Sequence, residues 1–137
     1  MTSFPDSEFH HVGVVCVSIA EEEVVWRAFG YVPEGDAFDD PMQGVRARFL
    51  VGGGPRIELL EALPGSQTLE AWLKRRVKFY HFGYRVADLD AAVAFHTQAG
   101  AVFVRPPEVS PYFGGGRLAF LMLSNAAFVE LIEKRKD

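Results

Sequence analysis

The sequence predicts an α+β fold made of two tandem βαβββ modules, at residues of about 9–62 and 80–134, joined by a linker at 63–79. One observation behind this prediction is an internal repeat, because the segment HVG at 11–13 recurs as HFG at 81–83. The other is that strand and helix signals follow one another in the same order in both copies. We therefore expect the whole chain to form a single domain.

The first module begins with a β-rich segment at 11–17, which predicts a strand. The helix expected at 20–29 ends at Gly30, a residue suited to a left-handed C-terminal cap. Three further strands are expected at 31–32, 44–51 and 56–62. The segment GGGP at 52–55 predicts the hairpin turn between the last two strands, and residues 66–74 of the linker predict a short helix.

The second module repeats this order, with a strand expected at 81–87 and a helix at 88–99. Asp88 is suited to cap the start of this helix, and Gly100 is suited to end it. The remaining strands are expected at 102–104, 117–123 and 127–133. Ser and Asn at 124–125 predict the turn between the last two.

Composition excludes several classes of protein. The formal net charge of −4 provides no general attraction for nucleic acid. The single cysteine, Cys16, excludes an intrachain disulfide and a cluster of thiolate zinc ligands. No apolar run approaches the roughly 18–20 residues that a membrane span needs. We expect a soluble cytoplasmic protein without nucleic-acid or membrane partners.

Alternation along the strands predicts which side chains share a face. In the first strand Val12, Val14 and Cys16 form an apolar row suited to pack against the helix, so His11 points to the opposite face. In the last strand of the module the same reasoning sends Glu58 to the face of His11. This face of the sheet is expected to lack a covering helix.

The second module places His81 and Glu130 at the positions equivalent to His11 and Glu58, because IELLE at 57–61 recurs as VELIE at 129–133. A single strand histidine is usually a hydrogen-bonded structural residue, and a strand glutamate is often exposed. Four such residues at symmetric positions favour a shared metal site instead. His10 and His96 have no counterpart of the same type across the repeat, and we expect them to be structural or surface residues.

Two neutral imidazoles and two carboxylates suit one divalent transition metal ion, such as Zn, Ni, Co, Mn or Fe(II). Around an octahedral ion, four protein ligands leave two positions for water or a bidentate substrate. The quartet His11, Glu58, His81 and Glu130 is therefore typical of a catalytic site rather than a closed structural one.

The third strand of each module suggests how a substrate is bound. Taking Val45, Ala47 and Phe49 as the row that packs against the helix places Met42, Arg46 and Arg48 on the site face, and Arg117 matches Arg46 in the second module. Arginines around an ion suit an anionic substrate such as a carboxylate or a CoA phosphate. The alternative is that they pair with nearby glutamates at 58, 61 or 133, or lie at a solvated rim.

A glycine-rich segment at 111–116 interrupts the second module. Tyr112 and Phe113 within it are candidates to cover the site as a lid, with Phe113 contacting substrate, and a plain connecting loop is the alternative. The segment is not a phosphate-binding loop, because no Lys-Ser/Thr pair follows it.

The segments at 11–13, 56–61, 81–83, 88–90 and 128–131 together resemble the vicinal oxygen chelate superfamily. This superfamily includes glyoxalase I, methylmalonyl-CoA epimerase, extradiol dioxygenases and the bleomycin and fosfomycin resistance proteins. The resemblance covers residues of about 9–134 and is strongest to the glyoxalase I and methylmalonyl-CoA epimerase branch.

The resemblance implies that the two modules form one curved, cupped sheet around a central site, and that His11, Glu58, His81 and Glu130 are the metal ligands. It implies proton abstraction next to a carbonyl, with a metal-stabilised enediolate and Glu130 as the catalytic base. The protein would then be an isomerase, epimerase or lyase acting on a small anionic or thioester substrate. Homodimers are common in this fold and are compatible with the composition.

One departure from the family pattern concerns Met42. Epimerases of this type carry a second glutamate just before the Gln-Gly-Val that stands here at 43–45, and a methionine cannot transfer a proton. The first expectation is therefore a metal-dependent isomerase, epimerase or lyase, either one that uses a single base or an epimerase that recruits another group as its second base. The alternatives are a ligand-binding or drug-resistance protein without catalysis, and an Fe(II) extradiol-type dioxygenase that uses His11, His81 and Glu130.

Overall fold

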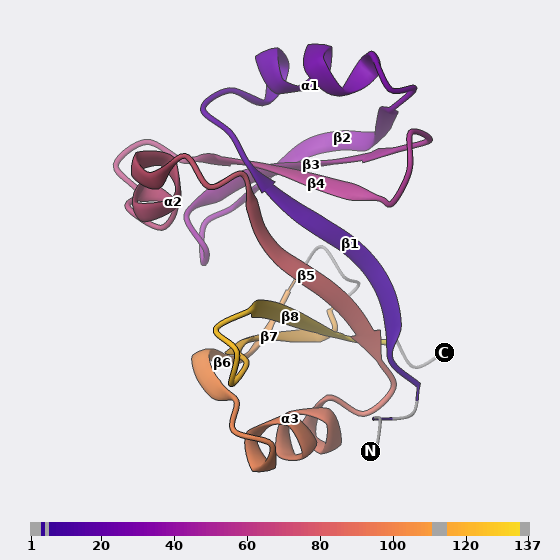
Figure 1. The fold of residues 1–137 in the computed structure, drawn as a ribbon, viewed down its shortest axis with the longest axis vertical. Coiled ribbons are helices and arrows are strands. Elements are labelled where there is room, and N and C mark those ends of the chain that lie inside the picture. The colour runs from indigo at the N-terminus through magenta and orange to yellow at the C-terminus, as the bar shows by residue number, and fades with distance from the viewer. Residues whose placement is uncertain (1–3, 5, 111–114, 135–137) are drawn as a thin grey trace. The chain divides into compact units, whose positions relative to one another are not determined.

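The computed structural model describes residues 4, 6–110 and 115–134 of the chain. It has the predicted α+β class and contains the βαβββ order twice, with a short helix between the copies (Figure 1). The elements are β1 (Glu8–Val15), α1 (Ile19–Arg27), β2 (Val32–Asp40), β3 (Val45–Val51), β4 (Ile57–Ala62), α2 (Glu70–Arg75), β5 (Phe79–Val86), α3 (Leu89–Gln98), β6 (Val102–Val109), β7 (Arg117–Met122) and β8 (Phe128–Glu133).

The chain divides into two compact units. The first unit is His11–Tyr80, and the second unit combines Met1–His10 with His81–Asp137. The boundaries lie within β1 and β5, so both strands contribute residues to both units. His11 and His81 are the residues at which β1 and β5 pass from one unit to the other.

In the first unit the strand order is β2-β3-β4-β1, and β1 runs parallel to β4 with Gly13 opposite Glu58. The segment that leads into β5 lies beside β1, where the Val15 amide donates to the Lys78 carbonyl at 2.7 Å. Helix α1 covers one face of β2–β4 (Figure 1). The core under this helix consists of Val14, Cys16, Ile19, Tyr31, Leu50, Ile57 and Leu59.

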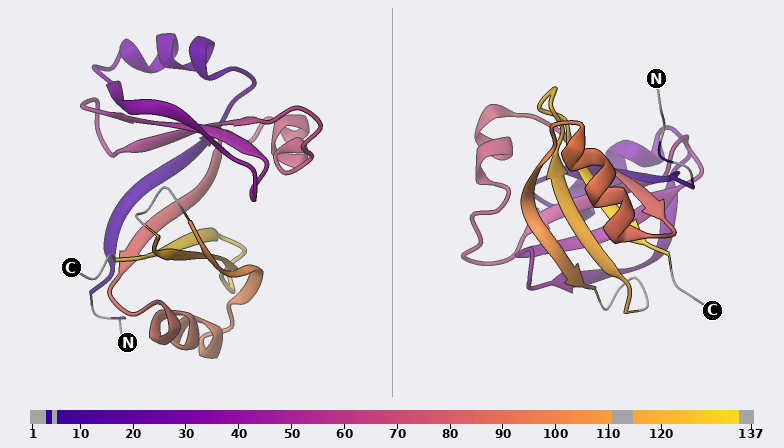
Figure 2. Two further views of the ribbon diagram at one scale, coloured as in Figure 1. Left: turned by 180° about the vertical axis from the view of Figure 1, so that it is seen from behind. Right: turned by 90° about the horizontal axis from the view of Figure 1, so that it is seen from below.

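In the second unit the strand order is β5-β8-β7-β6, and β5 runs parallel to β8 with Gly83 opposite Glu130. The start of β1 lies beside β5, where the rings of Phe9 and Phe82 are 5.7 Å apart. Helix α3 covers one face of β6–β8 (Figure 2). The core under it consists of Val86, Leu89, Ala92, Val93, Ala101, Ala119, Leu121, Val129 and Leu131.

Both predicted helices are present, at 19–27 where 20–29 was expected and at 89–98 where 88–99 was expected, and Asp88 caps the second as predicted. The Ser18 hydroxyl accepts the Glu21 amide at the start of α1, and the Asp88 carboxylate accepts the Ala91 amide at the start of α3. Gly30 and Gly100 follow the two helices with φ of +94° and +100°, a backbone conformation that favours glycine.

Strands β2 and β6 are longer than predicted. The sequence indicated strands at 31–32 and 102–104, whereas the structure extends them to Asp40 and Val109. Both stand at an end of the strand order, and both pair with their neighbour through register shifts. Edge strands tolerate proline, glycine and charged residues. The added residues of β2 and β6 include such types, so a search for apolar alternation does not detect them.

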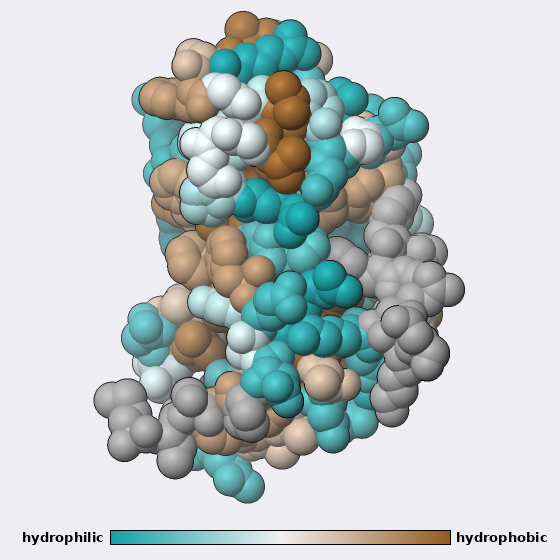
Figure 3. Space-filling model, turned by 90° about the vertical axis from the view of Figure 1, so that its right-hand side faces the viewer, coloured by the Kyte–Doolittle hydropathy of each residue, from teal (hydrophilic) through white to brown (hydrophobic). Residues whose placement is uncertain are grey.

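The molecular surface carries exposed apolar side chains on both units, including Val24 on α1, Phe29 just after α1 and Phe103 on β6. Figure 3 shows one face, on which hydrophobic and hydrophilic residues are interspersed. Among the residues that the structure describes, no helix is long and apolar enough to cross a lipid bilayer.

Candidate functional site

The first unit contains a buried pair of candidate metal ligands, His11 on β1 and Glu58 on β4. The parallel register places Gly13 opposite Glu58, so His11 lies on the same face two residues away. His11 Nε2 and Glu58 Oε1 are 3.2 Å apart, and the two residues are 0% and 7% exposed. The sequence-based expectation that these two side chains share a face agrees with this contact.

The second unit contains the equivalent pair, His81 on β5 and Glu130 on β8. Gly83 stands opposite Glu130, and His81 Nε2 lies 3.4 Å from Glu130 Oε1. Both residues are buried. Each unit therefore presents one imidazole nitrogen and one carboxylate oxygen in contact, through the same atoms and at the same positions of the repeat.

Each histidine also meets the edge of a phenylalanine that the sequence analysis did not assign to the site. The His11 and Phe49 rings are 5.3 Å apart at 77°, and the His81 and Phe120 rings are 5.4 Å apart at 85°. Phe49 stands opposite Glu58, and Phe120 stands opposite Glu130. The match of Phe49 with Phe120 across the repeat was the available signal. These rings restrict the orientation of the imidazoles.

The placement of Phe49 corrects the predicted faces of β3. The sequence analysis assigned Val45, Ala47 and Phe49 to the helix side, but the register pairs Phe49 with Glu58 and Arg48 with Leu59, a residue of the core under α1. The row with Phe49 therefore faces the His–Glu pair. Because Val45 and Ala47 are also buried, the apolar row alone does not tell which face of this strand the helix covers.

The donor set fits a metal ion chemically. Imidazole nitrogen and carboxylate oxygen are the ligand types that Zn, Mn, Fe, Co and Ni accept. A buried carboxylate is costly unless a charged or hydrogen-bonding partner compensates it. All four residues, His11, Glu58, His81 and Glu130, are buried and of kinds that could hold a metal.

Arg46 and Arg48 do not lie on the site face, contrary to the sequence-based expectation. Arg48 donates from Nη1 to Oε1 of Glu23 on α1 at 2.8 Å, and from Nε to the Gly35 carbonyl at 3.2 Å. Arg46 donates from Nε to Asp39 on β2 at 2.7 Å. Both arginines therefore lie on the face of β3 that carries α1. The prediction was wrong because it assigned the alternating side chains of this strand to the opposite faces.

Arg117 is likewise on the helix face of its unit. Its Nη2 lies 2.8 Å from Glu133 on β8 and 3.0 Å from Asp90 on α3. The hydrogen bonds from Arg117 lower the pKa of both carboxyl groups. Pairing with Glu133 was the alternative that the sequence left open, and it is the arrangement observed.

Two other predicted substrate contacts remain without structural support. Met42 lies in the turn between β2 and β3 and is 43% exposed. Phe113, together with Tyr112 and most of the glycine-rich segment, lies outside the described residues.

Comparison with known proteins gives a family match. A model described as the glyoxalase/bleomycin resistance protein/dioxygenase superfamily matches residues 10–120 of the chain. No curated protein sequence shows a significant match.

Solved structures show the same fold. A hypothetical protein from Bacillus halodurans C-125 has a TM-score of 0.79 and 23% identity, covering 96% of each chain. A variant of Streptomyces coelicolor methylmalonyl-CoA epimerase in complex with 2-nitronate-propionyl-CoA has a TM-score of 0.77 and 23% identity, covering 94% of this chain and 98% of that one. Methylmalonyl-CoA epimerase from Mycobacterium tuberculosis has a TM-score of 0.76 and 21% identity, covering 94% and 89%.

Proposed function

We propose that this chain, which belongs to the glyoxalase/bleomycin resistance protein/dioxygenase superfamily, is a divalent-metal-dependent isomerase, epimerase or lyase. Its reaction would begin with abstraction of a proton next to a carbonyl group. The observation that carries the proposal is the buried His–Glu contact found once in each repeat, 3.2 Å in the first unit and 3.4 Å in the second.

The proposed metal ligands are His11, Glu58, His81 and Glu130, which would hold one ion between them. The repeat supports this, because it supplies two equivalent half-sets of ligands, each too small to hold an ion firmly alone. Within each unit the histidine and the glutamate are buried and in contact, so each half-set is arranged in the same way. When bound, the ion would act as a Lewis acid for the negative charge that develops on a carbonyl oxygen.

Glu130 is the proposed base. Its strand, β8, is flanked by β5 and β7, with Gly83 and Phe120 as its register partners, so the backbone of Glu130 is held on both sides. The contact with His81 Nε2 restrains the carboxylate itself. A base fixed in this way reaches a substrate proton without first reorganising, which favours general base catalysis.

The proposed substrate is a small acyl thioester or a related molecule with an acidic proton beside its carbonyl. The support is that structural neighbours include methylmalonyl-CoA epimerases, one of them crystallised with methylmalonyl-CoA. A reaction that uses one base is proposed rather than a two-base epimerisation, because Met42 stands where the resemblance expects a second glutamate. An isomerisation or an elimination needs only one base, whereas an epimerisation would need another group in place of this glutamate.

Exchange of substrate protons with solvent deuterium tests this function. The protein, loaded in turn with Zn, Ni, Co, Mn or Fe(II), would be incubated in D₂O with hemithioacetals and with branched acyl-CoA esters, and deuterium next to the carbonyl measured by mass spectrometry. We expect catalysed exchange with at least one substrate, reduced by about 10²–10⁴-fold in Glu130→Gln. Glu70→Gln, an exposed glutamate paired with Lys74 on α2, is the matched control and should exchange normally.

Two results would contradict the proposal. Absence of exchange with every metal and substrate would leave a ligand-binding role. Undiminished exchange in Glu130→Gln would show that another group removes the proton.

A further inference from the structure

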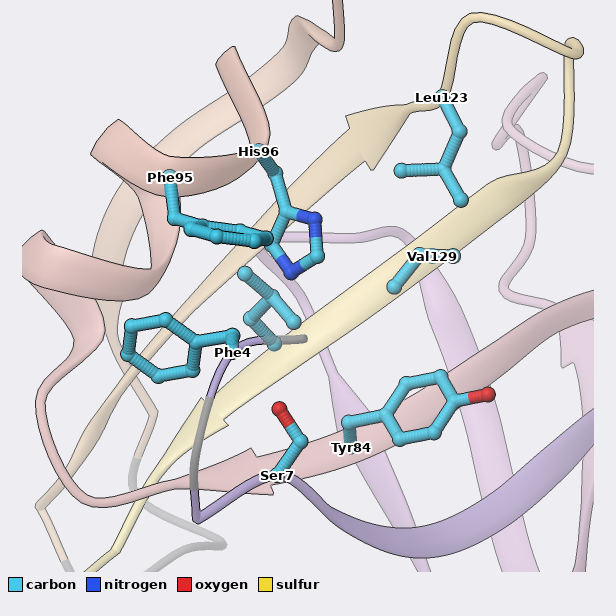
Figure 4. Close-up of a pocket in the computed structure, with 8 residues that line it drawn as sticks. Phe4, Ser7, Tyr84, Phe95, His96, Leu123 and Val129 are labelled. Atoms are coloured by element: carbon cyan, nitrogen blue, oxygen red, sulfur yellow. The ribbon is translucent and has the colours of Figure 1, made fainter. Parts of the chain in front are cut away.

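A cavity of about 330 Å³ lies within the second unit, between α3 and the strands it covers (Figure 4). Its walls are mostly apolar and aromatic, and the lining residues are Phe4, Ser7, Tyr84, Phe95, His96, Leu123, Val129 and Leu131. Cavities of this size and character are the usual sites of small-molecule binding. The cavity therefore has the dimensions of a ligand site although it contains none of the proposed metal ligands.

The cavity lies behind the His81–Glu130 pair. Val129 and Leu131 flank Glu130 on β8, and successive side chains of a strand point to opposite faces. Val129 and Leu131 pack in the core under α3, whereas Glu130 contacts His81 on the other face. A ligand in this cavity would therefore occupy a site separate from the metal ligands.

Aromatic rings form one side of the cavity. The Phe4 and Phe95 rings are 5.6 Å apart at 55°, and the Phe95 and His96 rings are 5.2 Å apart at 88°. Figure 4 shows Phe95 and His96 extending from α3, with Phe4 below them. Inclined rings of this kind offer both faces and edges, which suit a planar aromatic guest.

Three of the residues that line the cavity are polar, His96, Tyr84 and Ser7. Within residues 4, 6–110 and 115–134, these side chains have no hydrogen-bond partner. Burial lowers the pKa of His96, so the imidazole is neutral at neutral pH and has one nitrogen available to accept a hydrogen bond. No lining residue carries a full charge, which disfavours an ionic ligand.

The volume limits the size of the ligand. An apolar cavity of about 150 Å³ holds benzene in an engineered protein, so this cavity has roughly twice that room. One or two fused rings fit this volume, whereas a complete CoA thioester does not.

We propose that this cavity is a second ligand site, which takes a neutral aromatic molecule of one or two rings with an N–H or O–H group that donates to His96. The aromatic side wall and the apolar floor bind the rings, and the imidazole selects for the donor. This site does not depend on the proposed metal chemistry, so its test needs neither metal nor substrate.

Indole is a suitable probe, because it has two fused rings and one N–H donor. We would titrate the full chain, labelled on leucine and valine methyl groups, with indole and follow the methyl signals by NMR. We expect saturable shifts concentrated at Leu123, Val129 and Leu131, with a Kd of about 1 mM or lower. 1-Methylindole, which lacks the donor, should bind about three- to tenfold more weakly, the usual effect of one hydrogen bond.

Two variants sharpen the test. His96→Leu keeps an apolar wall but removes the acceptor, so indole and 1-methylindole should bind it equally. Leu123→Trp fills the half-buried rim and should abolish the shifts, with the remaining methyl spectrum showing that the chain is folded. The comparison of the two indoles on the unchanged protein needs no variant, so it holds even if a variant fails to fold.

The proposal is overturned if indole produces no saturable shift, or if the shifts arise mainly away from the cavity. Equal binding of indole and 1-methylindole to the unchanged protein would remove the assigned role of His96.

Discussion

Replacing Arg48 with methionine should destabilise the protein without affecting its metal chemistry. Arg48 Nη1 lies 2.8 Å from Oε1 of Glu23, a carboxylate on α1 that is only 5% exposed. Arg27 is a second cation near Glu23, at 3.5 Å and with a side chain 60% exposed. Methionine preserves the apolar stem of the arginine but leaves the buried carboxylate with this weaker partner.

The size of the effect follows from these contacts. A hydrogen bond to a charged group contributes about 1.5–3 kcal/mol, and breaking a fully buried ion pair costs about 3–5 kcal/mol. Because Arg27 remains and the Arg48 side chain is 28% exposed, we expect the free energy of unfolding to fall by about 2 kcal/mol. Urea denaturation monitored by circular dichroism would measure it.

Two further variants control this experiment. The double variant Glu23→Leu/Arg48→Met removes both charges and should recover most of the lost stability, because an apolar pair avoids the uncompensated carboxylate. Arg75→Met, an exposed arginine at the end of α2, should change stability by less than about 0.5 kcal/mol. The reasoning is refuted if Arg48→Met costs less than about 0.5 kcal/mol, or if it lowers metal affinity while the protein stays equally stable.

Three other predictions concern pH, reactivity and packing. The hydrogen bond with Arg117 lowers the folded-state pKa of Glu133 below its ordinary value of 4.5. The pair therefore stabilises the folded protein above pH 4.5, and this stabilisation is lost as the pH falls through the folded-state pKa. When the free energy of unfolding is measured against pH in acid, Glu133→Gln should show a smaller decrease than the unchanged protein. Burial raises the pKa of Cys16 to about 12, so iodoacetamide should alkylate it at pH 8 only after unfolding. In Gly53→Ala the new Cβ would lie 2.4 Å from the Tyr31 ring, so thermal unfolding should reveal a loss of about 1–3 kcal/mol.

The repeat explains why so much of the fold could be predicted. Matching His11 with His81 and Glu58 with Glu130 fixed the modules and the candidate ligands at once, because a duplicated structure repeats both its pattern and its strand neighbours. The parity of β1 and β4 was clear because an apolar row alternates there with the ligand positions. Asp88 was predicted as an N-cap because it is a capping residue type that stands directly before an apolar helical segment.

The faces of β3 could not be predicted in the same way. Both faces of this strand are partly buried, one by Val45 and Ala47 and the other by Leu50, so alternation gives no direction. The deciding information is the register with β4, which pairs Arg48 with Leu59. Register depends on the turn and on neighbouring strands, and a search for apolar alternation along one strand does not include either.

The number of metal ions per chain tests the central claim most directly. The protein, loaded with Co or Zn and desalted, would be analysed by plasma mass spectrometry beside His11→Ala in the first unit and His81→Ala in the second, with His96→Leu as a histidine control. A shared site predicts one ion per chain, lost in both alanine variants and kept in the control. Two ions per chain with one lost in each alanine variant would contradict the shared site, and no bound ion would contradict the metal centre altogether.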